Sequence, residues 1–179
     1  MPFGGSACQP LRVRILVRAA RSEDTSALVQ LRLANAERHI ELDPAAHRLP
    51  DAGAVRRYFQ DVLAAPATGD VLMLVAEASG QVVGMAEVAM LPEPPDHQIL
   101  VPRRAAQIHT VVLDGHRGKG VGQALVAAAE RAAADRGISI LIAPIFAPNT
   151  DALDFYVRAG FGEHGILLRK TPGGTTTDA

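Results

Sequence analysis

A glycine-rich run, DGHRGKGVG from Asp114 to Gly122, lies between a segment with the pattern of a strand and one with the pattern of a helix. The strand is expected over Ala106–Leu113, and the helix from about Val121 to Arg136, where Gly137 takes the left-handed cap position. Another apolar strand, from Ile138 to Ile145, follows at once. Because a helix between two strands returns the chain to a parallel position, this unit predicts a sheet with at least one parallel pair.

The rest of the chain predicts strands and helices that cover both faces of this sheet. Four prolines in residues 91–104 predict a long loop, since proline cannot donate a backbone hydrogen bond. Ala78-Ser79-Gly80, between two apolar runs, predicts a hairpin turn. The other expected strands are 13–18, 71–77, 82–90 and 161–169, and the last of these is a strand or a hairpin. The other expected helices are 23–39, with Ser22 as its cap, 53–63, and one that begins at Asn149 or Thr150 and ends at Ala159-Gly160. The predicted fold class is α/β (α+β), with a mixed, mostly antiparallel central sheet of six to seven strands and helices on both faces.

Length and composition fit one globular domain. The chain has 179 residues, of which 48% are hydrophobic and 21% charged, as in ordinary folded proteins. We expect a single domain over residues 11–170. Mobile tails are expected at 1–10 and 171–179, because both ends are rich in small or polar residues and offer few apolar groups.

Charge and hydropathy argue against several kinds of partner. The net charge is -1 and only 4% of residues are aromatic, so no nucleic-acid partner is expected. The longest apolar stretch, 138–146, is about half of the ~18 residues that a membrane span requires, so no membrane partner is expected. Cys8 is the single cysteine and cannot form an internal disulfide, and the first apolar run is broken by Arg12 and Arg14. A cytoplasmic protein is therefore expected.

The glycine-rich loop has the chemistry of an anion site. Backbone N–H groups at a helix N-terminus lack intrahelical partners and attract phosphate. The glycines at 118, 120 and 122 allow close approach to the backbone, and Arg117 and Lys119 add positive charge. A pyrophosphate would fit this loop. The alternative is a glycine-rich turn that only tightens the joint between strand and helix.

Two common nucleotide motifs do not match the loop. A P-loop needs Lys and Ser or Thr after its last glycine, whereas Gly120 is followed by Val121. A dinucleotide fingerprint needs G-x-G-x-x-G, whereas the residue three after Gly120 is Gln123. The sequence supports neither ATP hydrolysis nor a Rossmann fold.

A different pattern, R-x-x-G-x-G, is present at Arg117, Gly120 and Gly122. It is followed by Asn149, by the run ALDFY ending at Tyr156, and by AGF ending at Phe161. Together these motifs resemble the GCN5-related N-acetyltransferase (GNAT) family over most of the chain.

The resemblance implies a GNAT-like acyl-CoA N-acyltransferase fold with acetyl-CoA as co-substrate. It also implies that the loop binds the pyrophosphate, that the main chain of the strand before it pairs with the pantetheine, and that Asn149 hydrogen-bonds the pantetheine. The residues so assigned are Val111, Val112, Leu113, Arg117, Gly118, Lys119, Gly120, Val121, Gly122, Gln123 and Asn149. Asn149 can equally be a helix N-cap. The pantetheine needs a gap between the two parallel strands, and Pro144, expected within the second, cannot donate a ladder hydrogen bond there. The alternative is that Pro144 marks an edge bulge or the end of the strand.

The resemblance assigns Tyr156 as the acid that protonates the departing thiolate, and a phenol has a suitable pKa. Packing of its ring between helix and sheet is the alternative. Many relatives carry a glutamate on the strand before the loop, but here that strand holds no carboxylate. His109, with an ordinary pKa near neutral, and Glu87, on an otherwise apolar strand, are the candidate bases. The alternatives are a partly buried histidine with a backbone partner and a glutamate on a solvated strand face. A substrate that arrives deprotonated would need neither.

The acceptor is expected to be an amine of a small molecule or a protein. The elements that build the acceptor site in this family carry residues of both charges here: His39, Glu41, Asp43, His47, Arg48, Asp96, His97, Arg103, Arg104, Glu163 and His164. The spacing of His39, Glu41, Asp43 and His47 matches no fixed metal-ligand pattern and fits a solvated helix end instead, so no metal is expected. Two other classes stay open, a non-catalytic acyl-CoA-binding or sensing domain and a nucleotide-phosphate binder of another fold. Relatives often pair, so a homodimer is possible.

Overall fold

The computed structural model describes residues 14–66 and 69–170. The expected tails, Cys8 and the beginning of the first expected strand lie outside the described residues. None of the helices within the described part combines the length and the apolarity needed to cross a membrane.

Five strands form one mixed sheet in sequential order, β1 (Ile15–Ala19), β2 (Val71–Ala78), β3 (Gln81–Met90), β4 (Ala105–Val112) and β5 (Ile140–Ile142). The first four pair antiparallel, and β4 and β5 are parallel, as the strand–loop–helix unit predicts. The β2–β3 hairpin turns through Ser79 and Gly80, which have φ angles of 52° and 77°. The mixed α/β class is confirmed.

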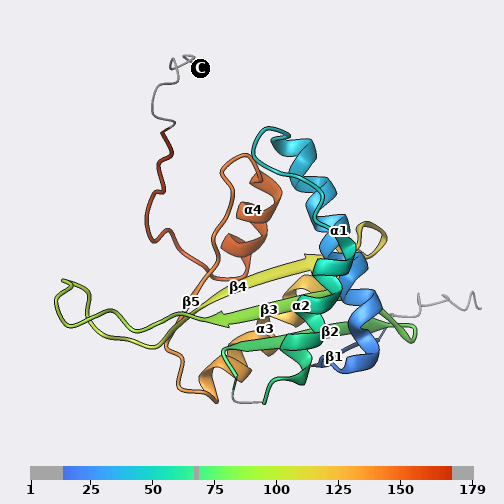
Figure 1. Cartoon of the computed structure of the whole chain (residues 1–179), viewed down its shortest axis with the longest axis horizontal. Helices are drawn as coiled ribbons and strands as arrows, with labels where there is room; N and C mark the ends of the chain where they lie inside the picture. The colour runs from blue at the N-terminus through green and yellow to red at the C-terminus, as the bar shows by residue number, and fades with distance from the viewer. Residues whose placement is uncertain (1–13, 67–68, 171–179) are drawn as a thin grey trace, which may run out of the picture.

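Helices cover both faces of the sheet (Figure 1). A short 3-10 turn, η1 (Ser22–Asp24), leads into α1 (Thr25–Leu42), which packs with α2 (Ala52–Ala64) on one face. On the other face lie α3 (Val121–Ala134) and α4 (Thr150–Arg158). Strand alternation sends side chains to two cores, one centred on Phe59 and Leu28 and the other on Leu125 and Ile108.

Local capping fixes where several helices begin and end. The Asp51 side chain accepts a hydrogen bond from the Ala54 N–H at 2.8 Å at the start of α2. The first long helix begins at Thr25, two residues later than the predicted Glu23, because Ser22 to Asp24 form the 3-10 turn. After α3, Gly137 has a φ of 70°, which confirms the predicted left-handed position.

Two predictions about the second half of the chain were wrong. The described residues form five strands rather than six to seven, because Phe161–Arg169 pairs with no strand. The parallel strand covers Ile140–Ile142 rather than 138–145, so Pro144 follows the strand instead of lying within it. The loop at 91–104 holds no helix or strand, as its prolines predict.

The parallel pair opens towards the glycine-rich loop. Pairing of β4 with β5 extends only from Ala105 to Gln107, whereas pairing of β4 with β3 extends over 106–112. Within the described part of the chain, the last five residues of β4 therefore have no strand on the β5 side. This opening confirms the predicted gap. It arises because β5 ends at Ile142, and not because Pro144 interrupts the pairing.

Candidate active site

The glycine-rich loop joins the open end of β4 to the start of α3. It begins with a 3-10 turn, η2 (Asp114–His116), and ends at Gly120, the N-cap of α3, whose φ of 84° is left-handed. Gly118 also has a positive φ of 70°. Both positions require glycine, because a side chain disfavours this conformation.

The first backbone N–H groups of α3 are the donors of this loop. Those of Val121, Gly122 and Gln123 have no partner within the helix, since the first intrahelical bond runs from Ala124 N to Gly120 O at 3.0 Å. The Val121 side chain is buried in the core. Gln123 is exposed. These donors suit a phosphate group.

Arg117 and Lys119, the charged residues of the loop, both bind loop backbone. The Arg117 Nε donates to Val112 O at 3.1 Å, and Lys119 Nζ donates to Gly115 O at 2.7 Å. Arg117 also pairs with Asp114 at 3.2 Å. Both cations are exposed at the same helix end as the free N–H groups, so the structure brings together the predicted anion-binding residues 117–123.

Tyr156 on α4 reaches the opened edge of β4. Its hydroxyl oxygen accepts a hydrogen bond from the backbone N–H of Thr110 at 3.1 Å, and the side chain is 6% exposed. The backbone N–H of Leu113 donates to Val83 O of β3. Because successive N–H groups of a strand point to opposite sides, the N–H of Thr110 points away from β3, towards the opening. Phe155 and Phe161 pack edge-on against the Tyr156 ring. Burial raises the pKa of Tyr156, and the adjacent Thr110 acts against that rise.

Glu87 and His109 lie opposite each other on β3 and β4. Both belong to the face covered by α1 and α2, because each lies two residues from a member of that core, Met85 for Glu87 and Val111 for His109. His109 is exposed, and Glu87 is buried at 7% exposure. The two candidate bases therefore form one site, on the face of β4 opposite the helix that carries Tyr156.

Both carboxylate oxygens of Glu87 are occupied. Tyr58 of α2 donates to Oε1 at 2.5 Å, and Arg32 of α1 donates to Oε2. The Arg32 guanidinium also lies over the rings of Tyr58 and Phe59, at 5.9 and 5.5 Å from their centroids. Burial and the Glu87 charge raise the pKa of Tyr58 well above its ordinary value, so it stays a hydrogen-bond donor.

His109 has the electrostatics of a neutral base. Partial desolvation of its ring lowers the pKa of His109, and Arg32 and His39 act in the same direction. Glu87 opposes them. A histidine with a lowered pKa is uncharged at neutral pH and can accept a proton.

Three aromatic rings contact one another in a row, and the first of them, His39, lies near His109. His39 and His47 are 5.1 Å apart, and His47 is 4.8 Å from the ring of Phe146, which follows β5. The Nδ1 atoms of His39 and His47 contact the backbone oxygens of Asn35 and Asp43. Arg38 of α1 binds Asp151 of α4 at 2.5 Å, so α1 and α4 are joined across this side of the molecule.

Asn149 caps α4, since its side chain accepts a hydrogen bond from the Ala152 N–H at 3.2 Å. The predicted helix-cap role is confirmed, and a role in binding pantetheine stays a prediction. Among residues 14–66 and 69–170, no group of three or more His, Cys, Asp or Glu side chains is arranged to hold a metal ion.

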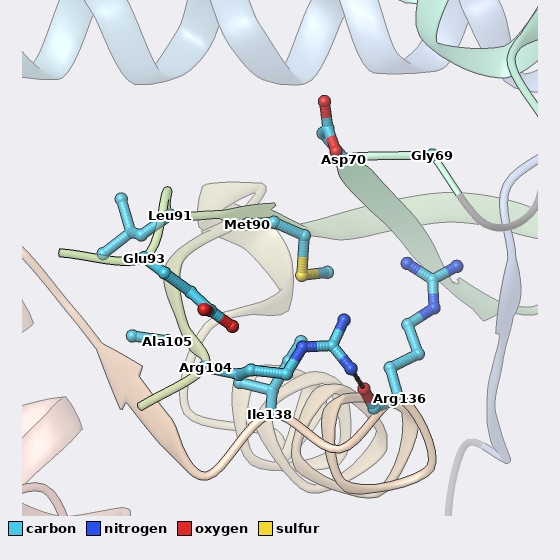
Figure 2. Close-up of a pocket in the computed structure, with 9 residues that line it drawn as sticks. All are labelled: Gly69, Asp70, Met90, Leu91, Glu93, Arg104, Ala105, Arg136 and Ile138. Atoms are coloured by element: carbon cyan, nitrogen blue, oxygen red, sulfur yellow. Dashed lines mark hydrogen bonds between the residues drawn. The ribbon is translucent and has the colours of Figure 1, made fainter. Parts of the chain in front are cut away.

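Arg104 lies away from the catalytic candidates, in a cavity of about 390 Å³ at the start of β4 (Figure 2). Its guanidinium donates to the backbone oxygen of Arg136 at 2.6 Å, and Met90 and Ile138 also line this cavity. The glycine-rich loop follows the other end of β4. Arg104 is therefore not brought together with His109, Glu87 and Tyr156.

Sequence reasoning missed Arg32, Tyr58 and Thr110. Arg32 lies four residues after Leu28 on the buried side of α1, and a cation in that stripe could have signalled a buried carboxylate partner. Tyr58 precedes the buried Phe59 and gave no comparable signal. Thr110 stands next to His109 in the strand, and only the tertiary structure shows that it meets Tyr156.

A mixed sheet that opens beside a glycine-rich helix N-terminus, with a tyrosine at the opened edge, defines the class of acyl-CoA N-acyltransferase folds. Within that class the chain belongs to the acetyltransferase (GNAT) family, whose profile matches residues 31–161. No curated protein matches the chain significantly.

Solved structures share the fold at low identity. A tetramutant of the BH1408 protein of Bacillus halodurans is 16% identical with a TM-score of 0.78, covering 87% of this chain and 99% of that one. Aminoglycoside N-acetyltransferase AAC(6')-Iy in complex with CoA is 18% identical with a TM-score of 0.67, covering 92% and 99%. Glucosamine-6-phosphate N-acetyltransferase of Arabidopsis thaliana is 16% identical with a TM-score of 0.62, covering 89% and 99%.

Proposed function

We propose that this protein transfers the acetyl group of acetyl-CoA directly to a primary amine of a small molecule or a protein. The observation that carries the proposal is the Tyr156 phenol, hydrogen-bonded to Thr110 N–H at the opened edge of β4. An acid at this position lies where the extra main-chain pairing of a pantetheine would end. Family membership supports an acyltransferase that binds CoA.

In this mechanism the loop holds the nucleotide end. The N–H groups of residues 121–123 and the side chains of Arg117 and Lys119 bind the pyrophosphate. The main chain of Val111 to Leu113 and the Asn149 side chain orient the pantetheine. Acetyl-CoA supplies an activated thioester, so positioning provides much of the rate.

Two proton transfers would occur on opposite sides of β4. His109 takes the proton of the attacking amine on the α1–α2 side, while Tyr156 gives its hydroxyl proton to the departing thiolate sulfur on the other side. Glu87, fixed by Arg32 and Tyr58, stabilises the imidazolium that forms on His109. The occupied oxygens of Glu87 favour His109 over Glu87 as the base.

The proposal also includes the location of the protein and its oligomeric state. A cytoplasmic location accords with a chain of 179 residues that has one cysteine. A homodimer is the assembly that we propose, on the exposed apolar residues described below.

Calorimetric titration with acetyl-CoA, CoA, ATP and NAD tests the cofactor. Tight binding of acetyl-CoA but not of ATP or NAD is expected, and the reverse would overturn the proposal. An amine panel, with release of free thiol as the readout, then tests transfer. In Tyr156→Phe, acetyl-CoA should still bind while transfer falls by about 10²-fold. Binding without transfer to any amine in the wild type would instead indicate a non-catalytic acyl-CoA-binding domain.

A further inference from the structure

We propose that Thr110 is a positioning residue for Tyr156, and that its hydroxyl donates a hydrogen bond to Tyr156 Oη once the phenol has given up its proton. The inference rests on the proposed function, because it assigns a second donor to the proposed acid. It concerns a residue that neither the family motif nor the candidate bases include.

The position of Thr110 carries the first step of the argument. It lies in the part of β4 that has lost β5, and its backbone N–H already binds Tyr156 Oη at 3.1 Å. Its side chain points to the face of Ile108, because residues two apart on a strand share a face. Tyr156 packs against this same core.

The Thr110 hydroxyl is the second step. Its Oγ1 is fully withdrawn from solvent and has no hydrogen-bond partner among the residues that the structure describes. A buried hydroxyl without a partner is costly, and valine would fill the same volume on a strand without that cost. An unpaired hydroxyl beside a phenol is therefore explained if a partner forms during the reaction.

Electrostatics agree with this geometry. Burial raises the pKa of Tyr156, whereas both the side chain and the backbone of Thr110 act to lower it. A hydroxyl hydrogen is free to rotate about its C–O bond, so Oγ1 can turn its hydrogen to a charged Oη without movement of the backbone. Two donors on one phenolate oxygen would make Tyr156 a stronger acid.

The chemical step involves one proton. The carbon–sulfur bond of the tetrahedral intermediate breaks, its electron pair stays on sulfur, and the Tyr156 hydroxyl proton passes to that sulfur. The phenolate left behind accepts hydrogen bonds from Thr110 N–H and Thr110 Oγ–H. It regains a proton from water after the thiol leaves. Thr110 itself transfers no proton.

The composition of the chain permits a direct test. Tyr58 and Tyr156 are the only tyrosines, so Tyr58→Phe leaves Tyr156 as the one phenol. Incorporation of 3-fluorotyrosine lowers the phenol pKa into a range where folded protein is stable, and fluorine NMR then follows the titration of this single group. We expect Thr110→Val to raise the pKa by about one unit, and Thr110→Ser to restore it. Equal values in Thr110→Val and Thr110→Ser would overturn the proposal.

Kinetics in the otherwise wild-type chain give the second measurement. Thr110→Val should lower kcat by about tenfold, with little change in KM for acetyl-CoA, whereas Thr110→Ser should stay near the wild-type kcat. A loss in Thr110→Ser as large as that in Thr110→Val would show a packing role only. Circular dichroism melts establish that each variant is folded.

The two measurements separate this inference from the proposed function. If the wild type transfers no acetyl group, the proposed function fails, while the fluorine titration still decides whether the Thr110 hydroxyl stabilises the Tyr156 phenolate. If the wild type is active and Thr110→Val has the wild-type kcat and pKa, only the inference about Thr110 fails.

Discussion

At the scale of single residues, His109 and Glu87 show how two neighbouring ionisable groups take different roles. Glu87 is buried, and both of its oxygens accept hydrogen bonds from Tyr58 and Arg32. His109 stands opposite it on β4 and is exposed to solvent. The carboxylate is therefore suited to orient and stabilise, and the imidazole to exchange a proton.

This division predicts the acid limb of the pH profile. Because the pKa of His109 is lowered, the neutral base should predominate at pH 7, and kcat/KM for the amine should fall only below the ordinary histidine pKa of about 6.5. His109→Gln should lower the plateau by about 10²-fold and abolish this limb. The measurement is the rate of thiol release between weakly acidic and weakly alkaline pH.

Two amines of different pKa provide the control for that profile. Ionisation of the amine gives a limb that moves with the acceptor, whereas a limb due to His109 stays in place. A His109→Gln enzyme that keeps the same limb and the same plateau would contradict the base role and favour a substrate that arrives deprotonated.

At the scale of elements, the joint between α3 and α4 depends on Gly122. A Cβ added there would lie 2.9 Å from Phe155 Cε2 and 3.0 Å from Phe155 Cζ, closer than packed atoms allow. Phe155 adjoins Tyr156 on α4, so Gly122→Ala should displace the ring and move the Tyr156 hydroxyl from β4. We expect a loss of stability of about 1–3 kcal/mol and a fall in kcat.

Gly115, in the same loop, supplies the matched control for this substitution. A Cβ at Gly115 would meet nothing within 4 Å. Gly115→Ala should therefore leave the urea midpoint and kcat close to those of the wild type. Equal effects of the two substitutions would show that the packing of Phe155 on Gly122 does not position α4.

The join between β1 and α1 depends on Asp24, a buried carboxylate. Its oxygens accept hydrogen bonds from Arg18 at 2.7 and 2.9 Å and from the Arg21 N–H at 2.7 Å. The Arg18 hydrogen bond lowers the pKa of Asp24, against the opposing effect of burial. Asp24→Asn should cost about 2–3 kcal/mol near neutral pH, because a charged hydrogen bond is lost and Arg18 keeps its charge.

The pH dependence of this cost has a defined sign. A carboxylate whose pKa is lowered by folding stabilises the native state fully above its unfolded pKa of about 3.9. That stabilisation is lost as the pH falls through the folded pKa. Urea denaturation should therefore show the difference between wild type and Asp24→Asn shrinking below about pH 4. Glu23→Gln, at the exposed neighbouring residue, is the control and should change the stability little near neutral pH or below pH 4. A loss of stability in Glu23→Gln as large as that in Asp24→Asn would contradict this explanation.

These elements also show what the sequence could predict. The strand–loop–helix unit, the hairpin at Gly80 and the Asn149 cap depend on residues close in the chain, and all three are present. The Arg32–Glu87 pair joins residues 55 apart and depends on how α1 crosses the sheet, so local patterns could not predict it. Residues 161–169 have strand-forming composition, but a strand also needs a partner, and composition does not supply one.

At the scale of the whole molecule, the sheet separates two working faces. The α1–α2 face carries Glu87 and His109, and the α3–α4 face carries Tyr156. The opening between β4 and β5 connects them, because the last residues of β4 lack a partner there. A thioester lying in that opening would be accessible to an amine from one face and to an acid from the other.

Residues 162–170 run away from the sheet beyond α4 (Figure 1). Ile166, Leu167 and Leu168 are 89%, 99% and 87% exposed, although their composition favours a strand. Three adjacent apolar side chains in water are unfavourable, and an extended segment with unpaired backbone can pair with an identical one across a two-fold axis. A second copy of this chain is therefore the partner that we expect for this segment.

Light scattering after size-exclusion chromatography tests this expectation. The wild type should have twice the chain mass of 18.9 kDa, and Ile166→Lys with Leu168→Lys should reduce the mass to that of one chain without loss of helical signal. Leu49→Lys is the control, since Leu49 is an exposed apolar residue at 52% on the loop between α1 and α2. A monomeric wild type at all concentrations would contradict pairing. A dimer unaffected by the lysines would place the interface elsewhere, because buried charges in a paired apolar segment cost more than the pairing provides.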